Sequence, residues 1–164
     1  MHEVYLGIGG NIGNKKYNFY KAKVLIQKKL GKVTGSSSIY ETPPWGFTSN
    51  DNFWNMVIKI ETSLMPEKLI AEIMQIEDSF NRKRIEGIYT SREMDIDILY
   101  YDYKIINTPI LKVPHPRLHD RLFVLTPLCE IAPGYKHPVL NMTNCKLLEN
   151  CKDKSDIKKL NVKL

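Results

Sequence analysis

The stretch from Arg92 to Tyr101, which reads REMDIDILYY, alternates between apolar and polar side chains. A period of two residues predicts a strand, and its buried face would carry Met94, Ile96, Ile98 and Tyr100. Asp95 and Asp97 would share the other face with Leu99. Their α-carbons would lie about 7 Å apart, where two unpaired carboxylates repel by about 2 kcal/mol at an effective dielectric of about 20. We therefore expect positive charge beside them.

Two kinds of partner would satisfy this pair. Mg²⁺ prefers oxygen ligands and often completes its shell with phosphate oxygens, so a metal site for a phosphorylated ligand is one interpretation. The other is a solvated strand face, on which neighbouring lysine or arginine side chains pair with the carboxylates. For an isolated Asp-x-Asp the second interpretation is the commoner one, so the rest of the chain has to decide.

Hydrophobic periodicity predicts further elements in the order strand, helix, strand, strand, helix, strand. They are a strand at 4–8, a helix burying Phe19, Ala22, Ile26 and Leu30, strands at 33–42 and 53–62, a helix burying Leu69, Ile73, Ile76 and Phe80, and the strand at 92–101. This order is typical of an α+β ferredoxin-like βαββαβ fold, with both helices on one face of an antiparallel sheet. The free face would carry Asn55, Asp95 and Asp97.

The glycine-rich run from Gly7 to Asn14 is predicted to be a turn into the first helix. A dinucleotide-binding loop would need glycine where Ile12 stands, and no phosphate-loop lysine follows. Two longer loops are expected at 43–52 and 82–91, the first because of its prolines and the second because it is polar, basic and contains Gly87. Each is either a mobile lid over a ligand or a static wall.

With 164 residues and 43% hydrophobic composition, the chain is expected to form one domain, 1–164, with a core at about 3–133 and a C-terminal extension at 134–164. Within it, 121–131 is predicted to be a helix distorted by Pro127. No apolar run reaches membrane-spanning length, so no membrane partner is expected. Three cysteines, an odd number without metal-ligand spacing, fit a reducing cytoplasm.

The net charge of +6 raises a second class of function. A ferredoxin-like fold with a basic surface could be an RNA-binding module. That interpretation needs an aromatic RNA-binding motif on a strand, which the sequence lacks. It also leaves Asp95 and Asp97 unexplained, because carboxylates repel a phosphate backbone, so no nucleic-acid partner is expected.

Several short segments follow one another in a fixed order along residues 4–133. They are Gly9-Gly10-Asn11-Ile12-Gly13, Tyr40-Glu41-Thr42-Pro43-Pro44-Trp45-Gly46, Phe53-Trp54-Asn55, Ile76-Glu77 with Arg82 and Arg84, Arg92 with Asp95-Ile96-Asp97-Ile98-Leu99, Val113-Pro114-His115-Pro116, and Arg121-Leu122-Phe123-Val124-Leu125-Thr126-Pro127-Leu128. In this order and spacing they resemble the 6-hydroxymethyl-7,8-dihydropterin pyrophosphokinase family of the folate pathway. The resemblance implies transfer of a pyrophosphoryl group from ATP to the hydroxymethyl group of the reduced pterin, with release of AMP.

The resemblance also implies roles for individual residues. Asp95 and Asp97 would hold two Mg²⁺ ions on the ATP phosphates, and Arg82 and Arg92 would contact those phosphates as catalytic residues. The implied pterin slot consists of Thr42, Pro43, Pro44, Phe53, Asn55 and Phe123. The implied ATP contacts are Glu77, Arg82, Arg84, Arg92, Ile98, His115 and Arg121. ATP and the pterin would be the partners of a monomeric cytoplasmic enzyme.

General chemistry agrees with these roles. Phosphoryl transfer needs positioning and charge neutralisation more than a covalent partner, and arginine's planar fork suits phosphate oxygens. Asn55 has both donors and acceptors for a pterin ring edge.

One departure of the sequence from the family lies just before Arg92. Ile88-Tyr89-Thr90-Ser91 stand where many members have Arg-Trp-Gly-Pro, so one phosphate or lid contact is absent or comes from Arg84. This departure keeps open a catalytically impaired pterin- or nucleotide-binding relative.

Overall fold

The computed structural model describes residues 1–44, 47–80 and 91–164, which form an antiparallel sheet with helices on both of its faces. The strands are β1 (His2–Gly10), β2 (Lys32–Ser36), β3 (Ile39–Thr42), β4 (Phe53–Thr62), β5 (Asp95–Tyr101), β6 (Ile106–Asn107), β7 (Lys112–Val113) and β8 (Lys158–Leu160). The helices are α1 (Lys15–Lys29), α2 (Pro66–Asp78), α3 (Leu122–Ile131) and α4 (Asn144–Asn150), with a 3₁₀ turn at Leu118–Asp120. The strands and helices predicted for the core are therefore present in the predicted order.

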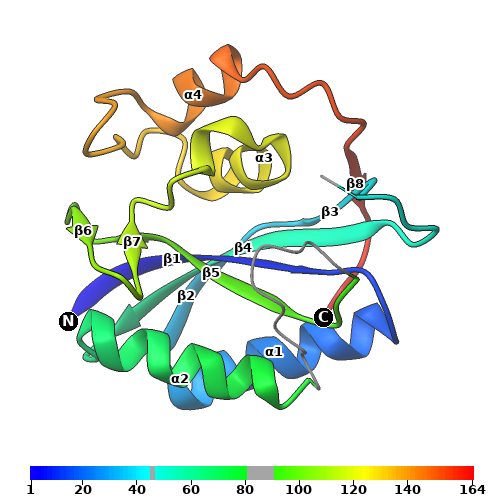
Figure 1. Ribbon diagram of the computed structural model, residues 1–164, viewed down its shortest axis with the longest axis horizontal. Helices are drawn as coiled ribbons and strands as arrows, with labels where there is room; N and C mark the ends of the chain where they lie inside the picture. The colour runs from blue at the N-terminus through cyan, green and yellow to red at the C-terminus, as the bar shows by residue number, and fades with distance from the viewer. Residues whose placement is uncertain (45–46, 81–90) are drawn as a thin grey trace.

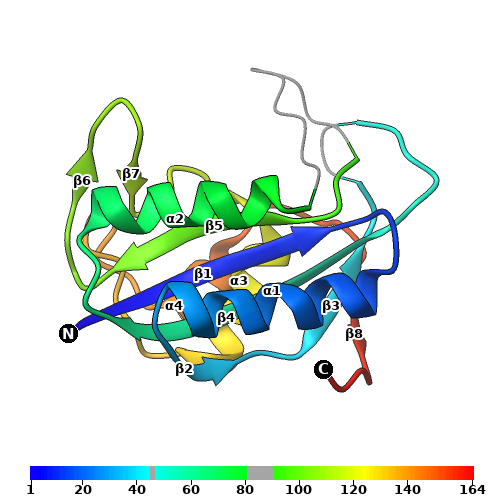
Figure 2. The same cartoon turned by 90° about the horizontal axis from the view of Figure 1, so that it is seen from below.

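The main sheet has the strand order β5-β1-β4-β3-β8, and β2 also pairs with β4. β1 is an interior strand, antiparallel to both β4 and β5. Figures 1 and 2 show α1 and α2 side by side under this sheet, while α3 and α4 lie above it. The α+β ferredoxin-like core, with α1 and α2 on one face, is confirmed.

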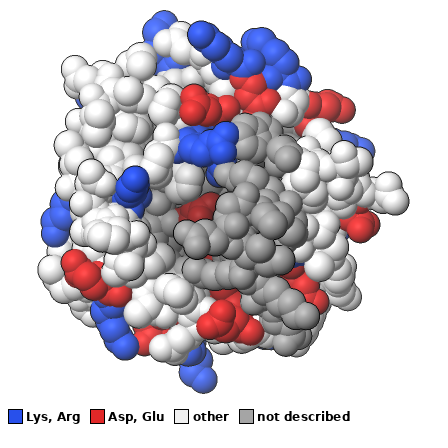
Figure 3. Space-filling model, viewed as in Figure 1, with Lys and Arg blue, Asp and Glu red and all other residues white. Residues whose placement is uncertain are grey.

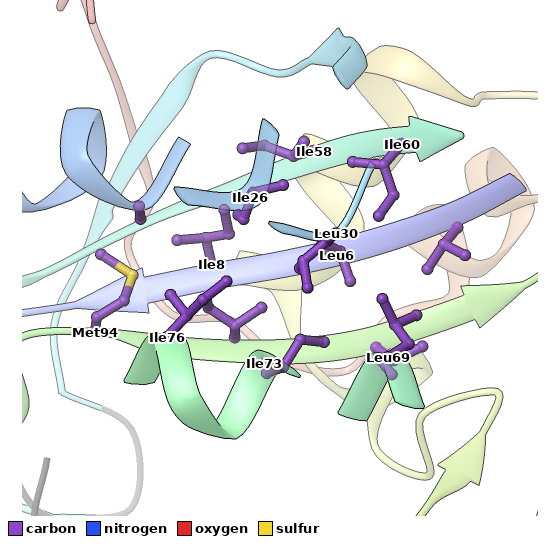
Figure 4. Packing of buried hydrophobic residues seen from close by; sticks show 14 of the residues in the cluster. Leu6, Ile8, Ile26, Leu30, Ile58, Ile60, Leu69, Ile73, Ile76 and Met94 are labelled. Carbon is purple, nitrogen blue, oxygen red and sulfur yellow. The ribbon is translucent and has the colours of Figure 1, made fainter. Parts of the chain in front are cut away.

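The larger hydrophobic core lies between the sheet and these two helices. The helical positions predicted to be buried, from Phe19 to Leu30 and from Leu69 to Phe80, are all buried. Figure 4 shows side chains of both helices facing the alternate apolar residues of the strands, among them Leu6, Ile8 and Ile58. The apolar faces that the helical period predicts for α1 and α2 therefore pack against the apolar face that the two-residue period predicts for the strands.

The opposite face of the sheet is covered for part of its length, so the prediction that it is free is wrong there. Tyr5, Val57 and Leu99 are apolar side chains on this face, and they pack against α3 and α4 in a second core. Burying this apolar surface is favourable, and α4, which belongs to the C-terminal extension, completes the layer (Figure 1).

The strand around the two carboxylates begins at Asp95 and contains a bulge. Leu6 pairs with Ile98 while Tyr5 pairs with Tyr100, so one extra residue, Leu99, is accommodated on β5. A one-residue shift moves the following side chains to the other face. Tyr100 therefore packs in the second core and not with Ile96 and Ile98, which corrects the predicted alternation.

Two other element boundaries differ from the prediction. β1 continues to Gly10, so Gly7 and Gly9 belong to the strand and not to the turn. The stretch 33–42 forms two short strands, β2 and β3, each paired with β4. The glycines weakened the apolar signal of β1, but β4 offers backbone partners along its whole length and β5 offers them from Val4 to Gly9.

The C-terminal extension is tied to the domain in two ways. Cys129 on α3 and Cys145 on α4 form a disulfide with Cα atoms 5.4 Å apart, and Cys151 is a buried thiol. Disulfides are uncommon in a reducing cytoplasm, so this pairing does not support the inference drawn from the cysteine count. Further along, β8 pairs with β3 and completes the edge of the sheet.

None of the helices in the described part of the chain is both long and apolar enough to cross a membrane.

A buried histidine gives the second layer a pH-dependent stability. His137 is 5% exposed, and its Nδ1 accepts the backbone N–H groups of Val139 at 3.2 Å and Leu140 at 3.0 Å. Burial, with the charge of nearby His119 adding to it, lowers the pKa of His137 from 6.5 to about 4. Between these two values the unfolded chain binds more protons than the folded one, so this contribution to stability is lost as the pH falls.

We therefore expect the difference in melting temperature between wild type and His137→Asn to be largest near pH 7 and to shrink toward pH 4.5. Thermal unfolding followed by circular dichroism across this range measures it. A difference that does not change with pH would show that His137 is not the titrating group.

Candidate functional site

A pocket opens on the sheet face that α3 leaves partly uncovered. It is lined by Gly7, Ile8, Gly9, Thr42, Pro43, Phe53, Asn55, Arg92, Asp95, Asp97, Leu99, Arg121, Phe123 and Val124. Nine of these residues were predicted as site residues. The fold brings them together from segments that lie far apart in the sequence. Their individual roles stay predictions.

The floor of the pocket is a strip of β1 without side chains. Gly9 pairs with Asn55 on β4 and with Asp95 on β5. Gly7 pairs with Asp97 on β5. A Cβ atom at Gly9 would lie 3.0 Å from the Asn55 Oδ1 atom. The hollow between the amide on β4 and the carboxylates on β5 therefore depends on the glycines between them.

One wall of the pocket carries a buried amide and two aromatic rings. Asn55 is 6% exposed, and its Nδ2 donates to the Thr42 Oγ1 atom at 3.0 Å. One N–H of this amide is thus engaged, which leaves its carbonyl oxygen and second N–H to meet a ligand. Phe53 and Phe123 also line the pocket, and flat apolar surfaces of this kind suit a planar ring.

The other wall is charged. The Arg92 Nη1 atom lies 3.6 Å from the Asp95 Oδ2 atom, and the Arg92 guanidinium carbon lies 5.4 Å from the centre of the Phe53 ring. The Arg92 Nε atom is buried and has no hydrogen-bond partner among the described residues. Arg121 is 7% exposed and its guanidinium carbon lies 5.6 Å from the centre of the Phe123 ring. Cations therefore stand beside both aromatic rings, suited to an anionic ligand.

Asp95 and Asp97 fit a cation that prefers oxygen ligands. Both carboxylates are half-buried and line the same pocket. Among the described residues no group of three or more His, Cys, Asp and Glu side chains could hold a metal ion. The two carboxylates would thus leave most of the coordination shell to phosphate oxygens and water, as Mg²⁺ commonly does.

His115 adjoins the pocket without lining it. Its Nδ1 accepts the Arg117 backbone N–H at 3.2 Å, and its own backbone N–H donates to the Leu99 carbonyl at 3.0 Å. Burial, with the positive charge of Arg121 adding to it, lowers the pKa of His115 from 6.5 to about 4. Near neutral pH the imidazole is therefore neutral, and its Nε2 atom carries the proton and can donate a hydrogen bond.

The structure places the remaining predicted residues elsewhere. Glu77 is 1% exposed and its Oε1 accepts the Ile96 backbone N–H at 2.9 Å, so it joins α2 to β5 beside the carboxylates. The Ile98 side chain lies in the larger core, so only its main chain could meet a nucleotide. Pro44 follows the pocket residue Pro43 without lining the pocket. Arg82 and Arg84 lie outside the described residues.

Five lining residues were missed by sequence reasoning: Gly7, Ile8, Gly9, Leu99 and Val124. A signal for the glycines was present, because they occur at positions i and i+2 and so share one strand face. It would have been recognised if β1 had been extended through Gly10.

Residues 5–133 match the family model described as 7,8-dihydro-6-hydroxymethylpterin-pyrophosphokinase. A 2-amino-4-hydroxy-6-hydroxymethyldihydropteridine pyrophosphokinase from Aquifex aeolicus is 41% identical over 139 residues, covering 85% of this chain and 86% of the relative. The protein of that name from Bacillus subtilis is 42% identical over 128 residues, covering 77% and 76%.

Two longer proteins contain a similar part. The folic acid synthesis protein FOL1 of Dictyostelium discoideum is 37% identical over 148 residues, which is 90% of this chain but 22% of that protein. A crystal structure of Plasmodium falciparum HPPK-DHPS with pteroate superposes with a TM-score of 0.74 at 17% identity, covering 91% of this chain and 44% of that one. The likeness to that structure shows a shared fold.

The family model spans most of the chain, and two relatives near 40% identity match over 86% and 76% of their own length. This chain therefore belongs to the 7,8-dihydro-6-hydroxymethylpterin-pyrophosphokinase family.

Proposed function

We propose that the pocket on β1 carries out the reaction of this family, the transfer of a pyrophosphoryl group from ATP to the hydroxymethyl group of 6-hydroxymethyl-7,8-dihydropterin in folate biosynthesis. One observation carries the proposal. A buried amide and a pair of carboxylates flank the glycine strip, with Asn55 and Asp95 both opposite Gly9. A polar planar ring and a polyphosphate can therefore meet over two strands.

The pterin would occupy the wall formed by β3, β4 and α3. The Asn55 amide would bond the polar edge of the ring, while Phe53 and Phe123 would cover its faces and Thr42 and Pro43 would close one side. Because the Thr42 hydroxyl accepts from Asn55, the amide is held in one orientation before the ligand arrives. A preoriented amide discriminates between ring edges.

The polyphosphate would lie on the charged wall. Asp95 and Asp97 would hold Mg²⁺, two ions by family resemblance, and bound Mg²⁺ supplies neutralisation and alignment of the phosphate oxygens. Arg92 and Arg121 would donate to phosphate oxygens, and neutral His115 would donate through its Nε2 atom. The contacts predicted for Arg82 and Arg84 fall outside the described residues and stay predictions.

The reaction itself is an in-line displacement. The hydroxymethyl oxygen of the pterin bonds to the β-phosphorus of ATP, and the bond from that phosphorus to the oxygen bridging to the α-phosphate breaks. The products are AMP and the pterin diphosphate, and the hydroxyl proton is lost to solvent. Such a step depends on positioning and charge stabilisation, which rigid strands bearing Asn55 and the two carboxylates provide.

The alternatives fit less well. An impaired relative would be expected to have lost part of the charged wall, but Arg92, Asp95 and Asp97 all line the pocket. An RNA-binding module would gather its cations on one face. Figure 3 shows described lysine and arginine side chains interspersed with acidic ones on the face in view.

Two further properties belong to the proposal. The enzyme is proposed to be a monomer, as the family resemblance implies. A cytoplasmic location is favoured by the use of ATP as substrate, whereas the Cys129–Cys145 disulfide does not favour it.

We expect that the protein, mixed with ATP, Mg²⁺ and 6-hydroxymethyl-7,8-dihydropterin, forms AMP in a pterin-dependent reaction. Chelation of Mg²⁺ should stop the reaction, because the two carboxylates would then repel the polyphosphate. Separation of the nucleotides by chromatography measures the outcome. Formation of ADP, or AMP formation that does not require pterin, would overturn the assignment.

Asp95→Asn and Asp97→Asn should each reduce kcat by about 100-fold or more, since electrostatic stabilisation through a metal amounts to several kcal/mol. The melting temperature should stay within a few degrees of wild type, because neither carboxylate is a core group. Asp156→Asn, which removes an exposed carboxylate of the C-terminal extension, is the matched control. Unimpaired turnover in both pocket variants would assign the pair a structural role.

Gly9→Ala should raise the KM for the pterin by about tenfold or more, because overpacking of a tight site costs about 1–3 kcal/mol. Its new Cβ would press on the Asn55 Oδ1 atom at 3.0 Å, whereas Gly35→Ala in β2 would make only an ordinary 3.5 Å contact with Lys59. Steady-state kinetics of both variants with varied pterin test this. Equal KM values would remove Gly9 from the pterin site.

A further inference from the structure

Asn11 joins three separate segments of the chain beside the pocket. It follows β1 directly and is 1% exposed. Its Oδ1 accepts the Arg92 backbone N–H at 2.8 Å, and its Nδ2 donates to the Asp51 carbonyl at 3.3 Å and to the Ser91 hydroxyl at 3.0 Å. Its own backbone N–H donates to the Arg92 carbonyl at 2.9 Å. One buried amide therefore links the end of β1 to the segments that precede β4 and β5.

These two segments each deliver a group to the pocket. Arg92, whose main chain is bonded to Asn11 through both its N–H and its carbonyl, places its guanidinium 3.6 Å from Asp95. Asp51 stands two residues before Phe53, whose ring centre lies 5.4 Å from the same guanidinium carbon. Asn11 therefore fixes the main chain on both sides of the contact between the cation and the ring.

Asparagine is suited to this position because its amide combines an acceptor with two N–H donors. A hydrophobic side chain here would leave buried peptide groups of both segments unpaired, which is costly. The Ser49 and Ser91 hydroxyls, 3.3 Å apart, bridge the same two segments. The arrangement is thus a small polar network in which Asn11 is the central member.

We propose that Asn11 is a positioning residue for pyrophosphoryl transfer: it holds Arg92 and the Phe53 segment at the separation that the bound substrates require. Asn11 does not line the pocket, so it acts through Arg92 and not on the substrates. This inference rests on the proposed function, because it takes the Arg92 guanidinium as a phosphate contact.

A double-mutant cycle tests the coupling. Asn11→Ala should lower kcat/KM by about 10- to 100-fold in the wild-type background, as displaced catalytic groups do. In an Arg92→Ala background the same change should alter kcat/KM by no more than about twofold. In an Arg121→Ala background it should retain its full effect, because Arg121 stands on a different segment.

Two further variants separate positioning from folding. Asn18→Ala removes a buried amide of α1, which donates to the Ile12 carbonyl at 3.4 Å, and should leave kcat/KM unchanged. Asn11→Asp keeps the acceptor for the Arg92 N–H but sets a carboxylate against the Asp51 carbonyl, and it replaces Asn11→Ala in the cycle if the alanine variant does not fold. Melting temperatures of all variants accompany the kinetics.

Three outcomes are decisive. Loss of activity that disappears when Arg92 is already alanine supports the proposal. The same loss in every background, or an equal loss in Asn18→Ala, overturns it while the proposed function stands. Absence of pterin-dependent AMP formation by the wild-type protein would instead remove the proposed function and this role with it.

Discussion

The pocket of this protein depends on two glycines, Gly7 and Gly9, which add no side chains to one face of the interior strand β1. β1 is hydrogen-bonded on both edges, so the sheet is continuous beneath the site. Gly7 and Gly9 leave the upper side of that strand bare, while Leu6 and Ile8 fill its lower side in the main core. The backbone of β1 is therefore held by both neighbouring strands, while its pocket side is open. Groups on β4 and β5 can then contact a ligand that spans about two strand spacings, or about 10 Å.

The second layer determines how much of this surface stays open. α3 packs on the sheet through Leu125 and Leu128, and its first turn reaches the pocket with Phe123. Farther along, Glu130 accepts the Tyr40 hydroxyl at 2.7 Å and the Ser38 backbone N–H at 3.0 Å, which joins α3 to β3. The disulfide to α4 and the pairing of β8 with β3 support the same helix and strand from outside. The C-terminal extension therefore stabilises the wall that carries Thr42.

The local sequence pattern predicted an element correctly where burial of one face was the only requirement on its side chains. β4 begins and ends where its alternation predicts, and the buried stripes of α1 and α2 are correct because each faces a single apolar layer. The pattern failed where a second requirement intervened. At Leu99 a bulge exchanges the faces of Tyr100 and its neighbours, and alternation alone contains no signal for such a shift. Glu77 illustrates a related limit, because only the fold shows that its carboxylate receives the Ile96 N–H.

The charge arrangement of the pocket constrains how its ligands can bind. Asp95 and Asp97 stand on the same face of β5, and the Arg92 Nη1 atom lies 3.6 Å from the Asp95 Oδ2 atom. A polyphosphate approaching alone is attracted by Arg92 but repelled by both carboxylates. In the proposed function, Asp95 and Asp97 would hold Mg²⁺, which would offset their repulsion of a polyphosphate and leave the Arg92 guanidinium to donate to phosphate oxygens. Under the proposed function, these two carboxylates would therefore favour the metal–nucleotide complex over the free nucleotide.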